Sequence, residues 1–392
     1  MATVAGQRST GNIASNQRRI DLTQKILRLE PDDSPLTVIS RQMKGSRKAT
    51  NNRTFQWAEQ QRLTRFDAIN NGAGYNTSAT SIVVDTGSLF SAGTLVKVPR
   101  TGEVFEVSAV STNTLTVVRG VGNSGTGVAI VDDDPLLILG RAAEEGGTSL
   151  QAIANDPTFV SNYTQIFKRS VEISGSAASE SNITQPHDWT FQHENEAMEH
   201  LLDMEDAFLF GKPDTTTLSI NSKPTYTTGG VLHFANQNGV AAGGTLTEAG
   251  FETFLRGAFR YGSKNKTLFA SPLLVSVLNN FSQTKLQTQV GQDTYGVSVM
   301  RWISPHGTVN IVKHNLLEGA TYGGYGILLD MGRGNVSYRY LDGDGPGGSR
   351  DTKLYKNRQA PDRDGLLDEW ITEAGLQFGE AKCHAVLTGV TG

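Results

Sequence analysis

The chain has 392 residues and a formal net charge of −4, and 37% of its residues are hydrophobic while 19% are charged. This composition is sufficient for buried cores, but no run approaches the roughly 20 apolar residues that a membrane-spanning helix needs. The single cysteine, Cys383, excludes an intramolecular disulfide and a cysteine metal cluster.

Charge is distributed unevenly along the chain. Residues 1–65 hold twelve Lys or Arg and five Asp or Glu, a local charge of +7, so the remaining residues sum to −11. This split predicts a basic N-terminal arm that lies on acidic surfaces of other copies or near nucleic acid. A solvated terminus without a partner is the alternative. No aromatic stacking pattern accompanies the basic residues, so sequence-specific recognition of nucleic acid is not expected.

The N-terminal region is predicted to contain short elements. Helices are expected at 21–29, ending before Pro31, and around 36–43, after a turn with capping residues. Residues 54–59 alternate like a strand, and the Asn- and Gly-rich stretch 70–74 is a loop.

A β-rich segment follows from about 75 to 140. Short strands recur at intervals of about ten residues and are separated by turns; they are expected at 81–84, 94–98, 103–107 and 115–119. This rhythm predicts a small antiparallel barrel or sandwich. Because the flanking segments have a different character, we interpret it as an insertion in a larger domain.

The most informative stretch is 161–212, where one or two strands end at Gly175 and a long helix follows. Pro186 and Asp188 open the helix, and Gly211 with Pro213 closes it after Phe210. At 1.5 Å per residue it would span roughly 34 Å. Two apolar stripes recur at helical spacing, namely Ala197, Leu201, Met204 and Phe208, and Met198, Leu202 and Leu209.

The C-terminal part predicts mixed α and β structure. A helix capped at 245–248 runs to about Tyr261 and buries Phe251, Phe254, Leu255 and Phe259. Ser271 and Pro272 open another helix. Strands are expected at 267–270, 297–303, 309–312, 326–329 and 336–341, then a charged loop at 342–366 and a terminal hairpin of 369–378 with 381–390.

Two glycine motifs resemble phosphate-binding loops but lack the required context. Residues 343–348 have the spelling G-x-G-x-x-G, yet Pro346 interrupts it and a polar loop follows where a helix is needed. Gly257 and the run 262–264 resemble a P-loop with the Lys and Ser in the wrong order. Neither is expected to bind a nucleotide.

Candidate metal and catalytic groups are equally incomplete. His193 and His200 are seven residues apart, nearly 11 Å by helix rise, because Ala197 occupies the position of the second zinc ligand. The run Asp132–Asp134 lacks the spacing of a calcium loop, and a Gly-x-Ser-x-Gly elbow is absent. We therefore predict no catalytic residue, no metal site and no cofactor, and expect the chain not to be an enzyme.

The order of these elements resembles a known family. The resemblance rests on the arm around 21–36, the Phe55–Trp57 strand, the segments 162–167 and 171–175, and the helix containing 201–207. It is firmest over 161–212 and 245–315. The chain is similar to the major capsid proteins of tailed bacteriophages with the Hong Kong-type capsid fold, in a divergent subfamily.

The resemblance implies an α+β fold with named parts. These are an N-terminal arm at 1–45; an extended loop region at 46–165 that contains the inserted β domain at about 75–140; a peripheral domain at 166–212 and 326–392 with a spine helix at 188–210; and an axial domain at 213–325. Some relatives cross-link Lys to Asn between subunits with a Glu as helper, but no motif here matches that trio, so no cross-linking residues are assigned.

The function implied is that of a coat protein whose copies form hexamers and pentamers of an icosahedral shell around a double-stranded DNA genome. Portal, scaffolding and decoration proteins are further possible partners, DNA would be contacted without sequence specificity, and no membrane is involved. The protein would belong to the virion and assemble in the host cytoplasm. Alternatives are an encapsulin-like nanocompartment shell with enzyme cargo, a tail or baseplate protein, and a metal-assisted enzyme using 132–134 or the two histidines.

Overall fold

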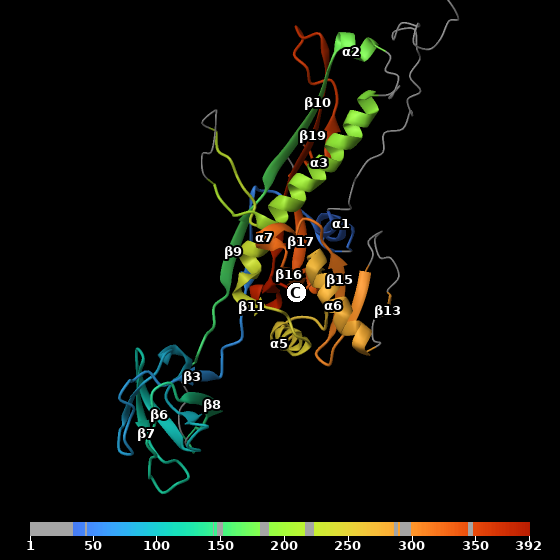
Figure 1. Ribbon diagram of the computed structural model, residues 1–392. Helices are drawn as coiled ribbons and strands as arrows, with labels where there is room; N and C mark the ends of the chain where they lie inside the picture. Colours follow the sequence, from blue (N-terminus) through green and yellow to red (C-terminus); the bar gives the residue numbers. More distant parts are fainter. Residues whose placement is uncertain are drawn as a thin grey trace, which may run out of the picture. The chain divides into compact units, whose positions relative to one another are not determined.

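The computed structural model describes residues 34–43, 45–143, 145–146, 152–180, 188–215, 223–285, 289–290, 299–343 and 348–392 (Figure 1). They divide into two compact units. We call Met1–Trp57 with Val160–Gly392 the body, and Ala58–Phe159 the barrel unit. The helix expected at 21–29 lies outside the described residues. Among the described helices, none is both long and apolar enough to cross a membrane.

The barrel unit is a closed sheet of six antiparallel strands. In spatial order these are β3 (Phe66–Ala68), β8 (Pro135–Arg141), β5 (Thr94–Lys97), β6 (Val104–Ser111), β7 (Thr114–Val118) and β4 (Ser81–Val83). The Ile69–Val84 bridge joins the first strand to the last, and the Asn70 N–H donates to the Val83 carbonyl at 3.0 Å. The four expected strands are present; β8 adds a strand that ends one residue after the range 75–140, and β3 adds one that precedes it.

Alternation of side chains explains the core of the barrel unit, because successive residues of a strand point to opposite faces. Ile82, Val96, Phe105, Val107 and Leu115 are fully buried. The two ends of the barrel unit's chain join the body through β2 (Thr54–Glu59) and β9 (Thr158–Tyr163), which pair with each other.

The body contains two larger sheets. The five-stranded sheet has the order β1 (Arg47–Thr50), β17 (Val336–Leu341), β19 (Gly365–Phe378), β10 (Gln165–Ser174), with β18 (Lys353–Tyr355) also paired to β19. The seven-stranded sheet has the order β11 (Gly239–Gly244), β20 (Ala385–Val390), β16 (Gly326–Leu329), β12 (Asn265–Ala270), β15 (Thr308–Lys313), β14 (Val299–Ile303), β13 (Gln289–Val290).

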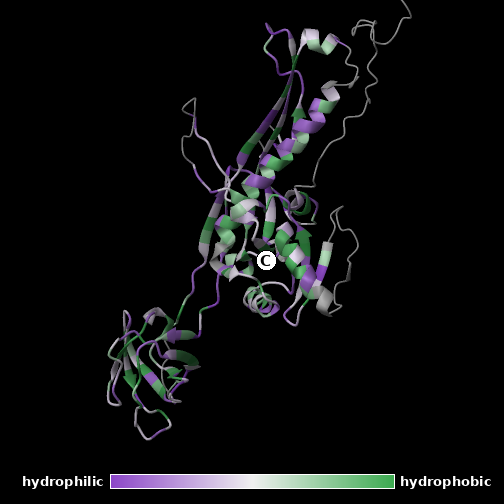
Figure 2. Ribbon diagram, in the orientation of Figure 1, coloured by the Kyte–Doolittle hydropathy of each residue, from purple (hydrophilic) through white to green (hydrophobic). Residues whose placement is uncertain are grey.

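The long helix α3 (Asp188–Phe210) has the predicted limits and runs along β10 and β19 (Figure 1). Hydrophobic and hydrophilic stretches alternate along it, as expected of a helix with one buried side (Figure 2). Phe208 is fully buried, with its ring centroid 6.0 Å from that of Phe167 and 6.1 Å from that of Tyr338. Met198, in the second predicted stripe, is instead 43% exposed.

The end of α3 is fixed by crowding as well as by Pro213. A Cβ added to Gly211 would lie 2.4 Å from the carbonyl oxygens of both Ala207 and Thr228. Only glycine fits there, so the glycine stop that the sequence predicts has a tertiary cause in addition to its local one.

Two helices pack on the seven-stranded sheet and begin at the predicted caps. Thr247 caps α5 (Glu248–Ala258) by accepting the Gly250 N–H at 3.1 Å. Ser271 Oγ accepts the Leu274 N–H at 3.2 Å at the start of α6 (Pro272–Lys285). The remaining short helices are α1 (Pro35–Gln42), α2 (Gly175–Ser179), α4 (Val231–Phe234) and α7 (Gly319–Tyr322), with 3-10 turns at Gly87–Leu89, Ala235–Asn238, Gly332–Gly334 and Ala381–Cys383.

The predicted terminal hairpin is wrong, because β19 and β20 belong to different sheets. Glu380 adopts a φ of +53° and the 3-10 turn Ala381–Cys383 follows, which redirects the chain before β20 begins. β20 then lies between β11 and β16. A buried strand shows the same pattern whichever sheet receives it, so alternation could not assign its partner.

Two further boundaries differ from the sequence expectation. The loop expected at 342–366 contains the short strand β18, and β19 already begins at Gly365. The sheet that contains most strands of 213–325, the expected axial domain, also includes β16 and β20 from beyond residue 325.

Candidate site at the N-terminal helix

The first described helix, α1, is held by a carboxylate from another helix. Its own cap residue, Ser34, makes no side-chain cap bond, and its first turn contains no acidic residue. Instead, Glu205 of α3 accepts the N–H groups of Leu36 at 2.8 Å and Thr37 at 2.7 Å, and the Thr37 hydroxyl at 2.5 Å. The unpaired N–H groups and positive dipole of a helix N-terminus favour a negative charge there.

The same carboxylate also contacts the end of a strand in the other sheet. His314, directly after β15, lies with its Nε2 2.7 Å from Oε1 of Glu205, and both side chains are fully buried. A charge removed from water is costly unless it is hydrogen-bonded. Glu205 therefore joins α1, α3 and the seven-stranded sheet at a single buried point.

Two arginines converge on a second buried carboxylate beside α1. The Tyr338 hydroxyl donates to Oδ1 of Asp351 at 2.8 Å, Nη2 of Arg41 lies 3.5 Å from the same oxygen, and Arg47 forms an ion pair with Oδ2. Burial alone would raise the pKa of Asp351, but the Tyr338 bond and the two arginine charges hold it below its usual value. Burial, and then the neighbouring Asp351 charge, raise the pKa of Tyr338.

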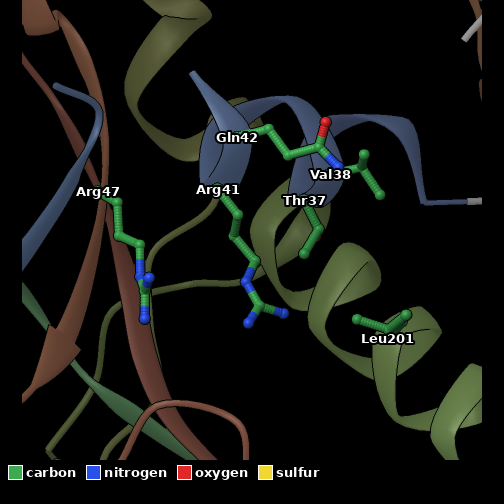
Figure 3. A pocket seen from close by; sticks show the side chains of 6 residues that line it. All are labelled: Thr37, Val38, Arg41, Gln42, Arg47 and Leu201. Carbon is green, nitrogen blue, oxygen red and sulfur yellow. The ribbon is translucent and has the colours of Figure 1, made fainter. Parts of the chain in front are cut away.

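Both guanidinium groups lie over aromatic rings at the edge of a pocket. Arg41 Cζ is 5.5 Å from the centroid of the Tyr338 ring, and Arg47 Cζ is 4.9 Å from that of Tyr340. The pocket has a volume of about 330 Å³ and is lined by Thr37, Val38, Arg41, Gln42, Arg47 and Leu201. In Figure 3 the Arg41 guanidinium lies between Arg47 and Leu201.

These contacts refine the expectation for the basic arm. Arg41 and Arg47 pair with an acidic residue of their own chain, and so does Arg53, whose Nε lies 3.5 Å from Oε1 of Glu373. Arg350 binds the other oxygen of Glu373 at 2.5 Å. The Lys and Arg residues nearer the N-terminus lie outside the described residues, so the expectation stays untested for them.

The two α3 histidines contact different residues. His193 Nε2 lies 3.1 Å from Oδ2 of Asp368, whereas His200 Nε2 lies 2.7 Å from the Thr372 hydroxyl. Burial lowers the pKa of His200 to about 4, so its ring is neutral near pH 7. Across the described part of the chain, no three His, Cys, Asp or Glu side chains are grouped to hold a metal ion.

The aspartate run forms a structured turn. Asp132 accepts the Asn71 N–H at 2.7 Å. The Asp134 carboxylate receives two hydrogen bonds from Arg100, both at 2.6 Å, and the Val131 N–H at 2.9 Å. These oxygens already have donors, which agrees with a turn before Pro135.

The glycine motifs also have local explanations where they are described. Gly262 has a φ of +84°, and the next residue, Ser263, donates its N–H to Asp330 at 2.7 Å. This is a tight turn after α5, and its Ser263 N–H already has a partner. Residues 344–347 of the other motif lie outside the described residues.

Sequence inspection missed the buried charges, although periodicity marked two of them. Glu205 lies four residues after Leu201 and four before Leu209, on an apolar side of α3. Lys266 alternates inward with Leu268 in β12, and it donates to the carbonyl oxygens of Ala258, Tyr261 and Cys383 at 2.7, 2.9 and 2.7 Å. A charged residue at a position where periodicity expects a buried apolar side chain predicts a buried, hydrogen-bonded charge. No pattern in the sequence around Asp351 identifies it as the partner of Arg41 and Arg47.

Comparisons with known proteins agree with this architecture. A family model described as "SU10 major capsid protein" matches residues 3–391. A curated relative, the "Major capsid protein" of Pseudomonas phage PaMx41, is 24% identical over 286 residues, which is 68% of this chain. The matched region spans 66% of that relative's length.

Two solved structures show the same fold at low sequence identity. The capsid of a native GTA particle is 10% identical with a TM-score of 0.50, over 99% of this chain and 100% of that chain. A chain of Gordonia phage Cozz is 10% identical with a TM-score of 0.50, over 100% of this chain and 97% of that chain.

Proposed function

Because the chain belongs to the SU10 major capsid protein family, we propose that its copies assemble into the hexamers and pentamers of an icosahedral shell that encloses the double-stranded DNA of a tailed phage. The family is one of structural proteins, not enzymes. The observation that carries the proposal is the family match across residues 3–391. The shared fold with the GTA capsid supports it.

The proposed parts of the shell subunit follow the sheets. The peripheral domain consists of α3, as its spine helix, with the five-stranded sheet. The axial domain consists of the seven-stranded sheet with α5 and α6, and it takes β16 and β20 from the range 326–392 because these strands pair there. The extended loop, at 46–165, carries the barrel unit, although its first strand β1 pairs in the five-stranded sheet, and 1–45 form the arm.

Assembly would be driven by burial of apolar surface between copies, with many weak contacts adding up in a closed symmetric array. Large apolar side chains are exposed on the elements of the proposed axial domain; they are Val240 (40%), Tyr261 (43%), Leu273 (38%) and Ile303 (53%). The barrel unit also exposes large apolar side chains, among them Phe66 (57%) and Phe159 (68%), so apolar surface that favours contacts between copies occurs on both units.

Electron microscopy of the purified full-length protein, expressed alone and with its phage partners, tests the proposal. Closed shells built of hexamers and pentamers, containing DNA when the packaging machinery is present, are expected. An exclusively monomeric protein would contradict it. Portal, scaffolding and decoration proteins, and assembly in the host cytoplasm, belong to the same proposal and are tested by the proteins that copurify with shells.

Two alternatives predict different products. A nanocompartment shell would contain protein cargo in place of nucleic acid, so the contents of purified particles distinguish it. A tail or baseplate protein would form rings or tubes. The similarity of this chain to the major capsid protein of Pseudomonas phage PaMx41 favours a phage shell over both alternatives.

A further inference from the structure

Within the described residues, the pocket beside α1 has an excess of positive charge that no other side chain neutralises. Arg41 and Arg47 share one carboxylate, that of Asp351, whose side chain is only 8% exposed. The pair of arginines and this aspartate sum to +1. Each guanidinium has five N–H donors, and the ion pairs with Asp351 are made through Nη2 of each.

Nearby carboxylates of the same chain already have partners. Glu205 is fully buried against α1 and His314. Asp203 accepts two hydrogen bonds from Arg169, at 2.6 and 2.9 Å. An anion that approaches the free N–H groups of the two pocket arginines would therefore come from outside this part of the chain.

The lining of the pocket indicates which anion fits. Val38 and Leu201 provide apolar walls, and the two guanidinium groups lie at one side, where Arg41 is 28% and Arg47 is 50% exposed (Figure 3). A volume of about 330 Å³ accepts one side chain. A carboxylate on a short apolar stem matches both parts of this lining.

We propose that this pocket binds an Asp or Glu side chain of an adjacent copy of the chain. The proposal rests on the proposed function, which places copies in contact. Charge complementarity supports this occupant, because residues 66–392 sum to −11 and an adjacent copy therefore has an excess of acidic residues over basic ones in this part of its chain. Arginine forks bind carboxylates with two parallel hydrogen bonds, which also fixes the orientation of the partner.

A tethered competitor tests the pocket. Val38 lies three residues before Arg41 on α1 and lines the pocket, so the carboxylate in Val38→Glu can reach the Arg41 guanidinium and exclude an incoming side chain. Val38→Gln has the same size without the charge and is the matched control. We expect the fraction of chains in particles to fall at least tenfold for Val38→Glu relative to Val38→Gln, while the thermal midpoints of the two unassembled subunits stay equal.

The partner can be identified by cross-linking. Arg47→Lys places an amine at the pocket, and a carbodiimide joins amines to carboxylates in contact with them. With particles assembled from mixed light and ¹⁵N-labelled copies, mass spectrometry should find amides between position 47 and an Asp or Glu of a differently labelled copy. Amides to Asp351 of the same chain provide the internal positive control.

Each other outcome contradicts the proposal. Equal assembly of Val38→Glu and Val38→Gln, or amides to Asp351 alone, would show that no side chain of an adjacent copy occupies the pocket. If empty shells form equally and only DNA-filled particles are impaired, the occupant is a phosphate and the proposal is wrong. A wild-type chain that forms no assembly would contradict the proposed function as well, so the two failures are distinguishable.

Discussion

Glu205 replaces a local helix cap with a distant one. It lies on α3, yet it accepts the N–H groups of Leu36 and Thr37, which are 169 and 168 positions away in sequence. An N-terminal cap formed in this way exists only when the helices are packed together. The fold of the body and the position of α1 are therefore coupled through one side chain.

Replacing Glu205 by glutamine should destabilise the body strongly. Glu205→Gln removes the charge that faces the α1 N-terminus and presents an NH₂ group to backbone donors, so we expect a loss of about 3 kcal/mol in the free energy of unfolding. Urea titration followed by circular dichroism measures it. Glu199→Gln, at a half-exposed position of the same helix, should change stability by less than about 0.5 kcal/mol; similar losses for both variants would refute the buried cap.

Buried neutral histidines make the body sensitive to acid. Burial lowers the pKa of His200 and of His384 to about 4 each. Because the unfolded side chains titrate near 6.5, the unfolded state binds more protons between these values. Stability is therefore full above about pH 6.5 and falls as the pH decreases towards 4.

The expected loss is roughly 1–2 kcal/mol per histidine at pH 5 relative to pH 7. Urea titrations of unassembled subunits between pH 7 and pH 5 measure the slope. His200→Gln retains a group that can bond the Thr372 hydroxyl but has no proton to bind, so its slope should be smaller than that of the wild type. An unchanged slope would show that His200 does not titrate in this range.

At the scale of elements, α3 supports the body through a few ring contacts. Phe208 lies between Phe167 on β10 and Tyr338 on β17, so this one residue of α3 contacts two strands of the five-stranded sheet. Met204, one turn earlier on the same side, and the adjacent Leu209 are also fully buried. The outer side of the helix carries carboxylates that pair with Arg169 or contact solvent.

Truncating the central ring tests this arrangement. Phe208→Ala should cost about 3–5 kcal/mol, because the removed ring leaves a cavity that packed neighbours cannot fill. Met198→Ala, at a residue 43% exposed on the same helix, should cost less than about 1 kcal/mol. Chemical denaturation of unassembled subunits gives both values, and a small cost at Phe208 would mean that the helix is held mainly by other contacts.

At the scale of the whole molecule, the chain contains two units with separate cores. The barrel unit has a closed sheet and a cluster of fully buried apolar residues. It also contains the buried ion pair of Arg119 with Glu103, which has two bonds of 2.6 Å. Because both the core and this ion pair lie within Ala58–Phe159, the unit has its own source of stability.

The isolated segment 58–159 should therefore fold by itself. We expect dispersed amide signals in NMR spectra and one cooperative thermal transition. Arg119→Met leaves the Glu103 carboxylate buried without its ion pair and should lower the stability by about 3–5 kcal/mol. A segment without a cooperative transition would show that the barrel depends on the body.

Local signals in the sequence determined much of the fold. Helical spacing with a Gly and Pro stop placed α3 within its observed limits, Thr247 and Ser271 marked the starts of α5 and α6, and turns at regular intervals marked the small barrel. These features depend on interactions between residues close in sequence, so a short window of residues contains their cause. The resemblance of their order to phage capsid proteins then gave the family.

Only the tertiary structure decided how distant segments meet. It placed β20 in the seven-stranded sheet where a hairpin was expected, gave Glu205 its partners on α1, and brought Arg41 and Arg47 to Asp351. Alternation along a strand shows which residues are buried but not which strand lies beside it, and a buried charge does not specify where its partner lies in the sequence. Both depend on contacts between residues far apart in the chain, and these form only in the packed molecule.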